Sequence, residues 1–254
     1  MPGRLDRLVV ACGLARSRAQ AQELIAAGQV RVAGVVVTKA AAAVPPGAEI
    51  TATPDPYVSR AAHKLLGALD DLRLAVGGRA LDAGSSTGGF TQVLLERGCR
   101  TVYAVDVGTD QLVAPLRAEP RVVVREQTNL RDLTLADLDG EPVDLAVADV
   151  SFISLTLLIG PLAAVTRPGG RMLLMVKPQF EVGRARLGRG GVVREPALHR
   201  EAVDTVLAAA QDRGWYVQAV RPSRLPGPAG NREFFVLLAD TEPEAGTGHL
   251  CWAG

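Results

Sequence analysis

The feature that most constrains the fold is a regular alternation of short apolar strands and amphipathic helices from Ser59 to about residue 240. Helices are expected over 60–72, 89–96, 155–165 and 196–213, and strands over 80–82, 101–105, 122–124, 144–148, 171–176, 215–221 and 233–238. Alternation of this kind places parallel strands side by side and covers the sheet with helices. The last two strands flank a Pro/Gly-rich loop and are expected to form a hairpin at the sheet. The sequence therefore predicts an α/β fold with a mostly parallel sheet.

A smaller unit is expected ahead of this sheet. Apolar spacing predicts helices over 5–13 and 18–27, and Ser17 is typical of a capping residue at the start of the second helix. Two β-branched runs flank Gly34 as the strands of a hairpin would, and residues 49–53 can supply a further strand. This pattern predicts a small α+β module.

The segment over 53–56, Thr-Pro-Asp-Pro, is a stiff linker, because each proline fixes its own backbone and restricts the residue before it. We therefore divide the chain into a module over 1–52, a linker over 53–58, a larger domain over 59–240 and a loose polar tail over 241–254.

Charge and cysteine content exclude several classes of protein. The three cysteines, Cys12, Cys99 and Cys251, are far apart and provide neither a disulfide framework nor metal-ligand spacing, so a reducing cytoplasm and no metal site are expected. The N-terminus lacks the apolar core of a signal peptide, and the most apolar long stretch, 145–165, is interrupted by Asp149 and by a Gly-Pro pair. No membrane span is expected.

The net charge is only +1, but basic residues are concentrated near the N-terminus. Before residue 51, Arg4, Arg7, Arg16, Arg18, Arg31 and Lys39 outnumber Asp6, Glu23 and Glu49. A local cationic surface suits a phosphate backbone, although a solvated helix face explains the excess as well.

A glycine-rich turn follows the first strand of the larger domain. The run Asp-Ala-Gly-Ser-Ser-Thr-Gly-Gly-Phe over 82–90 opens a helix, and its glycines allow the backbone to turn tightly and approach a ligand. The run does not match G-x-G-x-x-G, which argues against a dinucleotide dehydrogenase. Asp106 ends the next strand about twenty residues on, where a carboxylate can accept hydrogen bonds from ribose hydroxyls. Together these features predict a site for a nucleoside-containing cofactor.

Lysine is rare in this chain, because only Lys39, Lys64 and Lys177 occur among 28 basic residues. Arginine cannot lose its proton in a protein, whereas a lysine beside other cations or in a dry site can act as a base. Lys177 and Asp149 each follow an apolar strand at the carboxyl edge, where ligands bind in open α/β sheets. Lys64, in the helix expected over 60–72, and Glu233, at the start of the last strand, can lie at the same edge of the sheet. A single charge at a strand end is more often solvated, but four together indicate a catalytic cluster.

The N-terminal pattern R-L-D-x-L, followed by L-A-x-S-R-x-x-A-x-x-L-I-x-x-G-x-V-x-V-x-G, resembles the RNA-binding module named after the fourth small-subunit ribosomal protein. The resemblance runs from Arg4 to about Glu49 and implies that the second helix and its flanks lie on structured RNA. The implied RNA contacts are Arg4, Arg16, Ser17, Arg18 and Gln22. The alternative for Ser17 is that it only caps the helix, and the two roles are compatible.

The D-A-G-S-S-T-G-G-F-T run resembles the first motif of S-adenosylmethionine-dependent methyltransferases, in particular the heat-shock-induced ribose methyltransferase family. The resemblance implies a Rossmann-like methyltransferase sheet that binds S-adenosylmethionine. The implied cofactor contacts are Gly84, Ser85, Gly88, Gly89, Phe90, Asp106, Asn129 and Asp149. Phe90 would lie near the methionine end, with core packing as the alternative reading.

The motifs R-x-x-x-K-L, A-D-V-S-F, V-K-P-Q-F-E and R-E-F-F match the lysine-aspartate-lysine-glutamate tetrad of the same family. The resemblance implies that Lys177 acts as the base or near-base at a ribose 2′-hydroxyl and that Asp149 holds this lysine and the methyl group in line. It implies that Lys64 and Glu233 position the site and tune its charge. The glycine- and arginine-rich run over 183–191 directly follows the Lys177 motif and is either a phosphate-gripping lid or a plain surface loop.

The joint pattern of N-terminal module and methyltransferase motifs resembles the TlyA family over nearly the whole chain. That resemblance implies 2′-O-methylation of cytidines in small- and large-subunit ribosomal RNA, with ribosomes as partners, and a link to sensitivity to cyclic-peptide antibiotics such as capreomycin. The family also carries a hemolysin label, for which the sequence offers neither an amphipathic barrel pattern nor a membrane span. The alternatives are a non-catalytic RNA-binding or ribosome assembly factor and, less favoured, a hydride-transferring enzyme.

Overall fold

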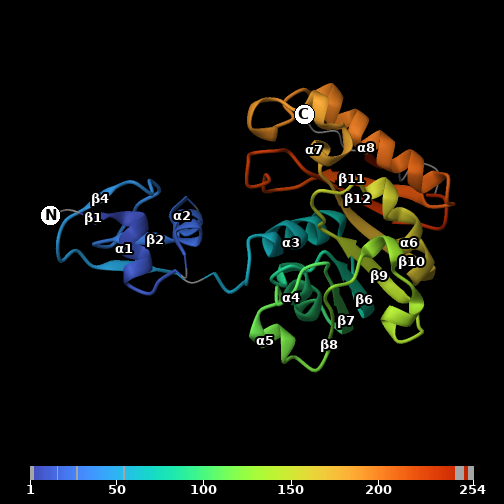
Figure 1. Cartoon of the computed structure of the whole chain (residues 1–254), viewed down its shortest axis with the longest axis horizontal. Coiled ribbons are helices and arrows are strands. Elements are labelled where there is room, and N and C mark those ends of the chain that lie inside the picture. The colour runs from blue at the N-terminus through green and yellow to red at the C-terminus, as the bar shows by residue number, and fades with distance from the viewer. Residues whose placement is uncertain (1–2, 16, 27, 54, 244–248, 251–254) are drawn as a thin grey trace. The chain divides into compact units, whose positions relative to one another are not determined.

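The computed structural model describes residues 3–15, 17–26, 28–53, 55–243 and 249–250, and it divides the chain into two compact units, Met1–Pro56 and Tyr57–Gly254 (Figure 1). Each unit has its own buried core. Among the described residues, no helix is long and apolar enough to cross a membrane.

The N-terminal unit is a small α+β module. Its elements are β1 (Gly3–Arg4), α1 (Leu5–Ala11), α2 (Arg18–Ala26), β2 (Val30–Val32), β3 (Val35–Val36), β4 (Ala43–Val44) and β5 (Ile50–Ala52). The expected hairpin is confirmed, because β2 pairs antiparallel with β3, and β5 pairs with the other edge of β2. The pairing of β1 with β4 was not expected. Leu5, Val9 and Ile25 are fully buried and pack the two helices against each other and against β2.

The larger unit is built on one sheet. Its elements are α3 (Ala61–Leu72), β6 (Gly78–Ala83), α4 (Gly89–Glu96), β7 (Cys99–Val105), α5 (Ala114–Arg117), β8 (Val122–Arg125), η1 (Leu130–Asp132), η2 (Leu135–Leu138), β9 (Val143–Ala148), η3 (Leu155–Leu157), α6 (Ile159–Val165), β10 (Thr166–Val176), α7 (Pro178–Glu181), η4 (Arg184–Arg186), η5 (Arg189–Gly191), α8 (Pro196–Gln211), β11 (Tyr216–Pro222), β12 (Phe234–Ala239) and β13 (His249–Leu250). The strand order is β13-β11-β12-β10-β9-β6-β7-β8. All neighbours are parallel except β12, which runs antiparallel to both β10 and β11. The predicted α/β class and mostly parallel sheet are confirmed.

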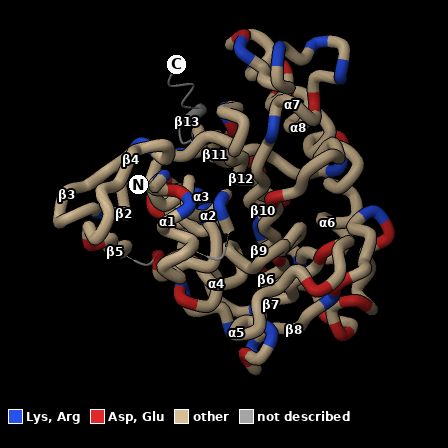
Figure 2. Tube along the Cα trace, turned by 60° about the vertical axis from the view of Figure 1, so that its left-hand side comes forward, with Lys and Arg blue, Asp and Glu red and all other residues tan. Residues whose placement is uncertain are grey.

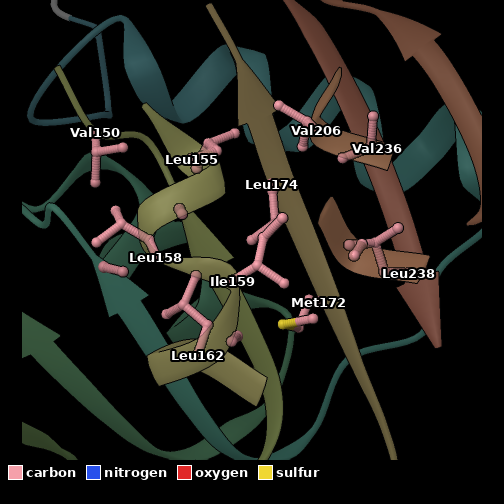
Figure 3. Packing of buried hydrophobic residues seen from close by; sticks show 14 of the residues in the cluster. Val150, Leu155, Leu158, Ile159, Leu162, Met172, Leu174, Val206, Val236 and Leu238 are labelled. Atoms are coloured by element: carbon pink, nitrogen blue, oxygen red, sulfur yellow. The ribbon is translucent and has the colours of Figure 1, made fainter. Parts of the chain in front are cut away.

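Alternating side chains of the central strands bury two separate cores, one on each face of the sheet. Leu173 and Met175 of β10 face the helices α3 and α4, whereas Met172 and Leu174 face α6 and α8. Figure 3 shows the second face, where Leu158, Ile159 and Leu162 pack against β10. Because both faces are covered, ligands can reach the strands only at their ends.

Several boundaries differ from the expectation. The helix expected over 155–165 is divided into η3 and α6, and β10 begins at Thr166 instead of residue 171. The early part of β10 contains Pro168, Gly169 and Gly170, which hid its strand character from a periodicity argument. In the tail expected to be loose, His249–Leu250 pairs with β11, and residues 244–248 and 251–254 lie outside the described residues.

Candidate functional site

Three charged side chains of the site stand at the ends of three neighbouring strands. Asp149 follows β9, Lys177 follows β10, and Glu233 precedes β12. In the register, Ala148 of β9 is paired with Leu174 and Phe234 of β12 is paired with Val176. Because β9 and β10 are parallel and β12 is antiparallel to them, the three charged residues meet at the carboxyl edge of the sheet.

Lys177 is paired with Asp149 at this edge. Its Nζ lies 2.7 Å from Asp149 Oδ1 and donates a hydrogen bond to Ser151 Oγ at 3.0 Å. Lys177 is 8% exposed, so its ammonium group is largely removed from water. Sequence reasoning missed Ser151, although it lies two residues after Asp149.

Lys64 forms the second pair. It projects from α3, and its Nζ lies 2.6 Å from Glu233 Oε2, with both residues almost completely buried. A Cβ on Gly227 would lie 2.5 Å from Glu233 Oε1, so the loop before β12 needs a glycine here to pass beside the pair. Lys39, the remaining lysine, is exposed. The structure thus places the four charged residues predicted to be catalytic in two lysine–carboxylate pairs, of which Lys64–Glu233 is buried and Lys177–Asp149 is partly exposed through Asp149.

The glycine turn lies directly beside Asp149. Gly84 has a left-handed backbone, and a Cβ on it would stand 3.1 Å from the carbonyl oxygen of Asp149. At Gly88, φ is +100° and a Cβ would lie 2.3 Å from Leu116 Cδ1, so a side chain cannot be accommodated. The turn therefore brings bare backbone up to the same strand edge as the Lys177 pair.

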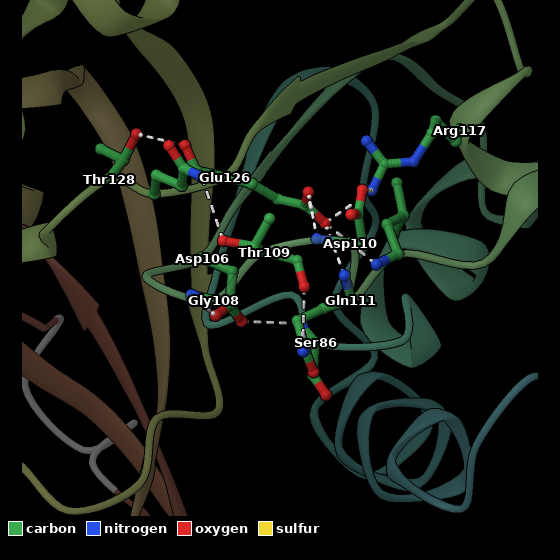
Figure 4. A network of polar contacts seen from close by, with 11 residues as sticks. Ser86, Asp106, Gly108, Thr109, Asp110, Gln111, Arg117, Glu126 and Thr128 are labelled. Carbon is green, nitrogen blue, oxygen red and sulfur yellow. Dashed lines mark hydrogen bonds and ion pairs between the residues drawn. The ribbon is translucent and has the colours of Figure 1, made fainter.

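Asp106 holds the far side of this turn. Its two carboxylate oxygens accept hydrogen bonds from the backbone N–H groups of Ser86 (2.8 Å) and Gly108 (2.7 Å), as Figure 4 shows. The backbone N–H of Thr128 donates to the Asp106 carbonyl oxygen, which places the segment after β8 next to the end of β7. Asn129 in this segment caps η1 by accepting from Arg131 N.

Glu126 fixes the loop that follows Asp106 and was not singled out from the sequence. Its carboxylate accepts hydrogen bonds from the backbone N–H groups of Asp110, Gln111 and Leu112 and from Arg117 (Figure 4). The Arg117 guanidinium and these N–H groups lower the pKa of Glu126 to about 2. The loop beside the glycine turn is therefore held by a permanently ionised carboxylate.

Asp82 lies beneath the turn and is fully buried at the end of β6. One carboxylate oxygen accepts a hydrogen bond from Thr91 Oγ1 at 2.6 Å, and the other, Oδ1, has no hydrogen-bond partner among the described residues. Burial raises the pKa of Asp82 to about 7, with a further contribution from the negative charge of Asp149. The sequence could have revealed Asp82, because an acid within an apolar strand is costly to bury unless it has a specific partner or role.

The structure places Phe90 in the core, where it is 2% exposed and its ring stacks on Phe235 with centroids 6.2 Å apart. Of the two readings of Phe90, this arrangement corresponds to core packing. Phe90 follows Gly89 at the start of α4.

Residues 57–239 match the model of the FtsJ-like methyltransferases, and residues 3–50 match that of the S4 domain. The chain belongs to the FtsJ-like methyltransferase family. It is an enzyme of this family with an N-terminal S4 domain.

Relatives agree with this assignment. The 16S/23S rRNA (cytidine-2′-O)-methyltransferase TlyA of Mycobacterium tuberculosis is 50% identical over 92% of this chain and 89% of its own length. Hemolysin A of Brachyspira hyodysenteriae is 36% identical over 91% of this chain and 97% of its own. A solved structure of a hemolysin candidate from Streptococcus thermophilus is 39% identical with a TM-score of 0.75, covering 96% of this chain and 92% of that chain. The relatives named as hemolysins therefore align with this chain along nearly its whole length, across both domains.

Three of the five residues expected to contact RNA surround the carboxylate of Asp6. Arg4, Arg18 and Gln22 all donate hydrogen bonds to the carboxylate of Asp6. Ser17 accepts from Gln20 N and caps α2. Arg16 lies outside the described residues.

The arginine-rich run over 183–191 forms the two short turns η4 and η5 after α7, and Figure 2 marks its basic positions in blue. Arg186 is tied to Glu201 of α8 by an ion pair. Asn231 accepts a hydrogen bond from Val193 N and donates one to Gly191 O, so the end of this run is fastened to the loop before Glu233.

Proposed function

We propose that this methyltransferase transfers a methyl group from S-adenosylmethionine to the ribose 2′-hydroxyl of cytidines in small- and large-subunit ribosomal RNA. The observation that carries the proposal is the Lys177–Asp149 pair, 2.7 Å apart, at the strand edge that also bears the glycine turn. The M. tuberculosis relative, named for this reaction, is 50% identical and supports the choice of substrate.

The residues at the glycine turn fit a nucleoside-containing cofactor. A side chain at Gly84 would crowd the Asp149 backbone, and the buried Asp82 Oδ1 has no hydrogen-bond partner within the described part of the chain. We propose that the cofactor is held by backbone at Gly84, Ser85, Gly88 and Gly89 and by the side chains of Asp106, Asn129 and Asp149. Bound there, S-adenosylmethionine supplies an electrophilic methyl group. Phe90 is left out of this set, because its ring is buried against Phe235.

We propose that Lys177 first releases its own ammonium proton to solvent and that its neutral amine then accepts the proton of the ribose 2′-hydroxyl. A lysine amine without its proton has a lone pair for this purpose, whereas arginine does not. Asp149 and Ser151 orient the amine from two sides. Lys64 and Glu233 act as a buried positioning pair behind it, since each neutralises the other where water is excluded.

The S4 domain is proposed to dock the enzyme on ribosomal RNA. The module over 1–52 would contribute Arg4, Arg16, Ser17, Arg18 and Gln22, with 53–58 as a linker to the methyltransferase domain over 59–240 and a tail over 241–254. Because the proposed substrate is the ribosome, we propose that the protein acts in the cytoplasm and that its activity changes sensitivity to cyclic-peptide antibiotics.

The proposal is tested by following labelled methyl groups from S-adenosylmethionine into ribosomal RNA. The wild-type chain is expected to label both ribosomal RNAs, and Lys177→Ala is expected to abolish labelling while RNA binding, measured by filter retention, stays at the wild-type level. A wild-type chain that binds ribosomal RNA without labelling it would instead indicate a non-catalytic assembly factor.

A further inference from the structure

The carboxylate of Asp6 is completely buried although it lies at the start of α1, the first helix of the chain. It is covered by the side chains that donate to it. Arg4 Nε donates to Oδ1 at 3.1 Å, and Oδ2 accepts from Arg4 Nη2 (3.1 Å), Arg18 Nη2 (2.9 Å) and Gln22 Nε2 (3.1 Å). These donors hold the pKa of Asp6 far below its usual range, so the group is always ionised.

The donors themselves are not buried. The side chains of Arg4 and Arg18 are 47% and 52% exposed, and Gln22 is exposed as well. A guanidinium has five N–H donors in a planar fork, and Arg4 uses only its Nε and one Nη toward Asp6. Each arginine therefore keeps donors that face water, with its orientation already fixed.

The three donors come from separate parts of the chain, so a shared acceptor is needed to hold them together. Arg4 belongs to β1, whereas Arg18 and Gln22 lie one turn apart on α2, so the chain brings them together from separate elements. Two cations held side by side repel each other, and Asp6 offsets that repulsion while it leaves a net positive charge on the cluster. A flexible arginine loses side-chain entropy when it binds a phosphate, and a pre-oriented one has already lost it.

We propose that Asp6 is a positioning residue for RNA recognition, which presents Arg4 and Arg18 as a preformed fork for the RNA phosphate backbone, with Gln22 beside it. The inference rests on the proposed function, because it takes ribosomal RNA as the ligand of the S4 domain. It assigns Asp6 no contact with RNA.

The substitution Asp6→Asn separates this role from simple electrostatics. Removal of a negative charge beside a phosphate-binding surface should by itself strengthen RNA binding. If Asp6 orients the two arginines, the same substitution instead weakens binding to ribosomal RNA by about tenfold and lowers the slope of log affinity against log salt by about one. The KM for RNA in methyl transfer is expected to rise in parallel, with kcat unchanged.

Glu49→Gln is the matched control, because Glu49 is an exposed acid of the same domain with no side-chain contact to the fork among the described residues. It is expected to bind RNA as tightly as the wild-type chain or slightly more tightly. The double variant Arg4→Ala/Arg18→Ala removes the fork, and adding Asp6→Asn to it should cause no further loss.

The outcomes distinguish the inference from the proposed function. If Asp6→Asn binds at least as tightly as the wild type while the double arginine variant binds weakly, Asp6 does not orient the fork. If the double arginine variant also binds normally, the fork does not contact RNA, and the inference is overturned although methyl labelling by the wild type stands. If the wild type labels no RNA at all, the proposed function fails on its own.

A measurement on the unmutated chain keeps the inference testable if Asp6→Asn unfolds the N-terminal unit. In ¹⁵N NMR spectra of the full chain, the Nε–H proton of Arg4 is expected to exchange with water several-fold more slowly than that of Arg7, which is exposed and contacts no acid among the described residues. Equal exchange rates would overturn the inference.

Discussion

The N-terminal module and the strand edge of the methyltransferase domain both pair acids with bases, but they distribute burial in opposite ways. At Asp6 the acid is buried and its two arginine partners are about half exposed. At the strand edge the bases are buried, with Lys177 at 8% and Lys64 at 4% exposure.

The difference corresponds to different chemical tasks. Arginine keeps its charge in every protein environment, so an exposed, oriented guanidinium suits permanent attraction to phosphate. Lysine can give up its proton, so a lysine largely removed from water suits a reaction in which a proton moves. This chain uses only three lysines, and two of them lie at the strand edge.

The largest expected effect tests whether Lys177 is needed as a proton acceptor or only as a charge. Lys177→Arg retains the charge but not the ability to lose a proton, so methyl transfer is expected to fall by about 10³-fold while RNA binding is retained. Lys39→Arg, at an exposed lysine, is the control and should keep wild-type activity. A Lys177→Arg enzyme within tenfold of wild type would show that charge alone suffices.

The second prediction concerns the energetic cost of leaving the buried Lys64 ammonium group without its carboxylate partner. Glu233→Gln leaves the Lys64 ammonium without a countercharge, and the free energy of unfolding is expected to drop by about 3 kcal/mol, measured by urea denaturation. Adding Lys64→Met should restore most of the loss, because an apolar side chain needs no partner. A Glu233→Gln chain as stable as wild type would contradict the pairing.

The third prediction uses the pKa of Asp82, which burial raises to about 7 from 3.8. Between about pH 4 and 7 the folded chain holds a proton here that the unfolded chain has lost, so this group's contribution to stability falls as pH rises through that window and is constant above it. The upper bound of the change is about 4 kcal/mol. Asp82→Asn is expected to flatten this decline in thermal unfolding and to be more stable than wild type at pH 8. Parallel pH profiles for the two chains would disprove the shift.

The smallest effect is expected at an ion pair that is exposed on both sides. Arg186 and Glu201 lie 2.5 Å apart, with side chains 43% and 50% exposed. Water and salt screen such a pair, so Glu201→Gln should leave the midpoint of thermal unfolding unchanged. A clear destabilisation would mean that burial is a poor guide to the value of ion pairs in this molecule.

The sequence predicted the elements whose pattern is local. Helix α4 has the bounds that its apolar spacing predicts, and the glycine turn stands where a strand meets that helix. The short pairing of β1 with β4 was missed, because two-residue strands carry no periodicity. The hairpin of β11 and β12 was expected, but the insertion of β12 between β10 and β11 depends on pairings that no local pattern encodes.

The same distinction applies to the site. Asp149, Lys177 and Glu233 were singled out because charged residues at strand ends stand out against apolar runs, and Lys64 because lysine is rare in this chain. Asp6, Asp82, Glu126 and Ser151 were not assigned a role, because their importance lies in contacts with donors that the fold supplies from elsewhere. Residue type and position can indicate reactive groups and some of their partners, whereas these further supporting groups emerge only from tertiary contacts.

The central claim is that the enzyme uses the residues at this strand edge to methylate ribose in ribosomal RNA. Mapping the methylated nucleotides tests this claim most directly. A 2′-O-methyl group blocks alkaline cleavage of the adjacent phosphodiester bond, so ribosomal RNA from cells with and without this protein can be compared by partial alkaline hydrolysis. We predict protected cytidines that disappear when the protein is absent and when Lys177 is replaced by alanine. Identical cleavage patterns in all three RNAs would contradict the account.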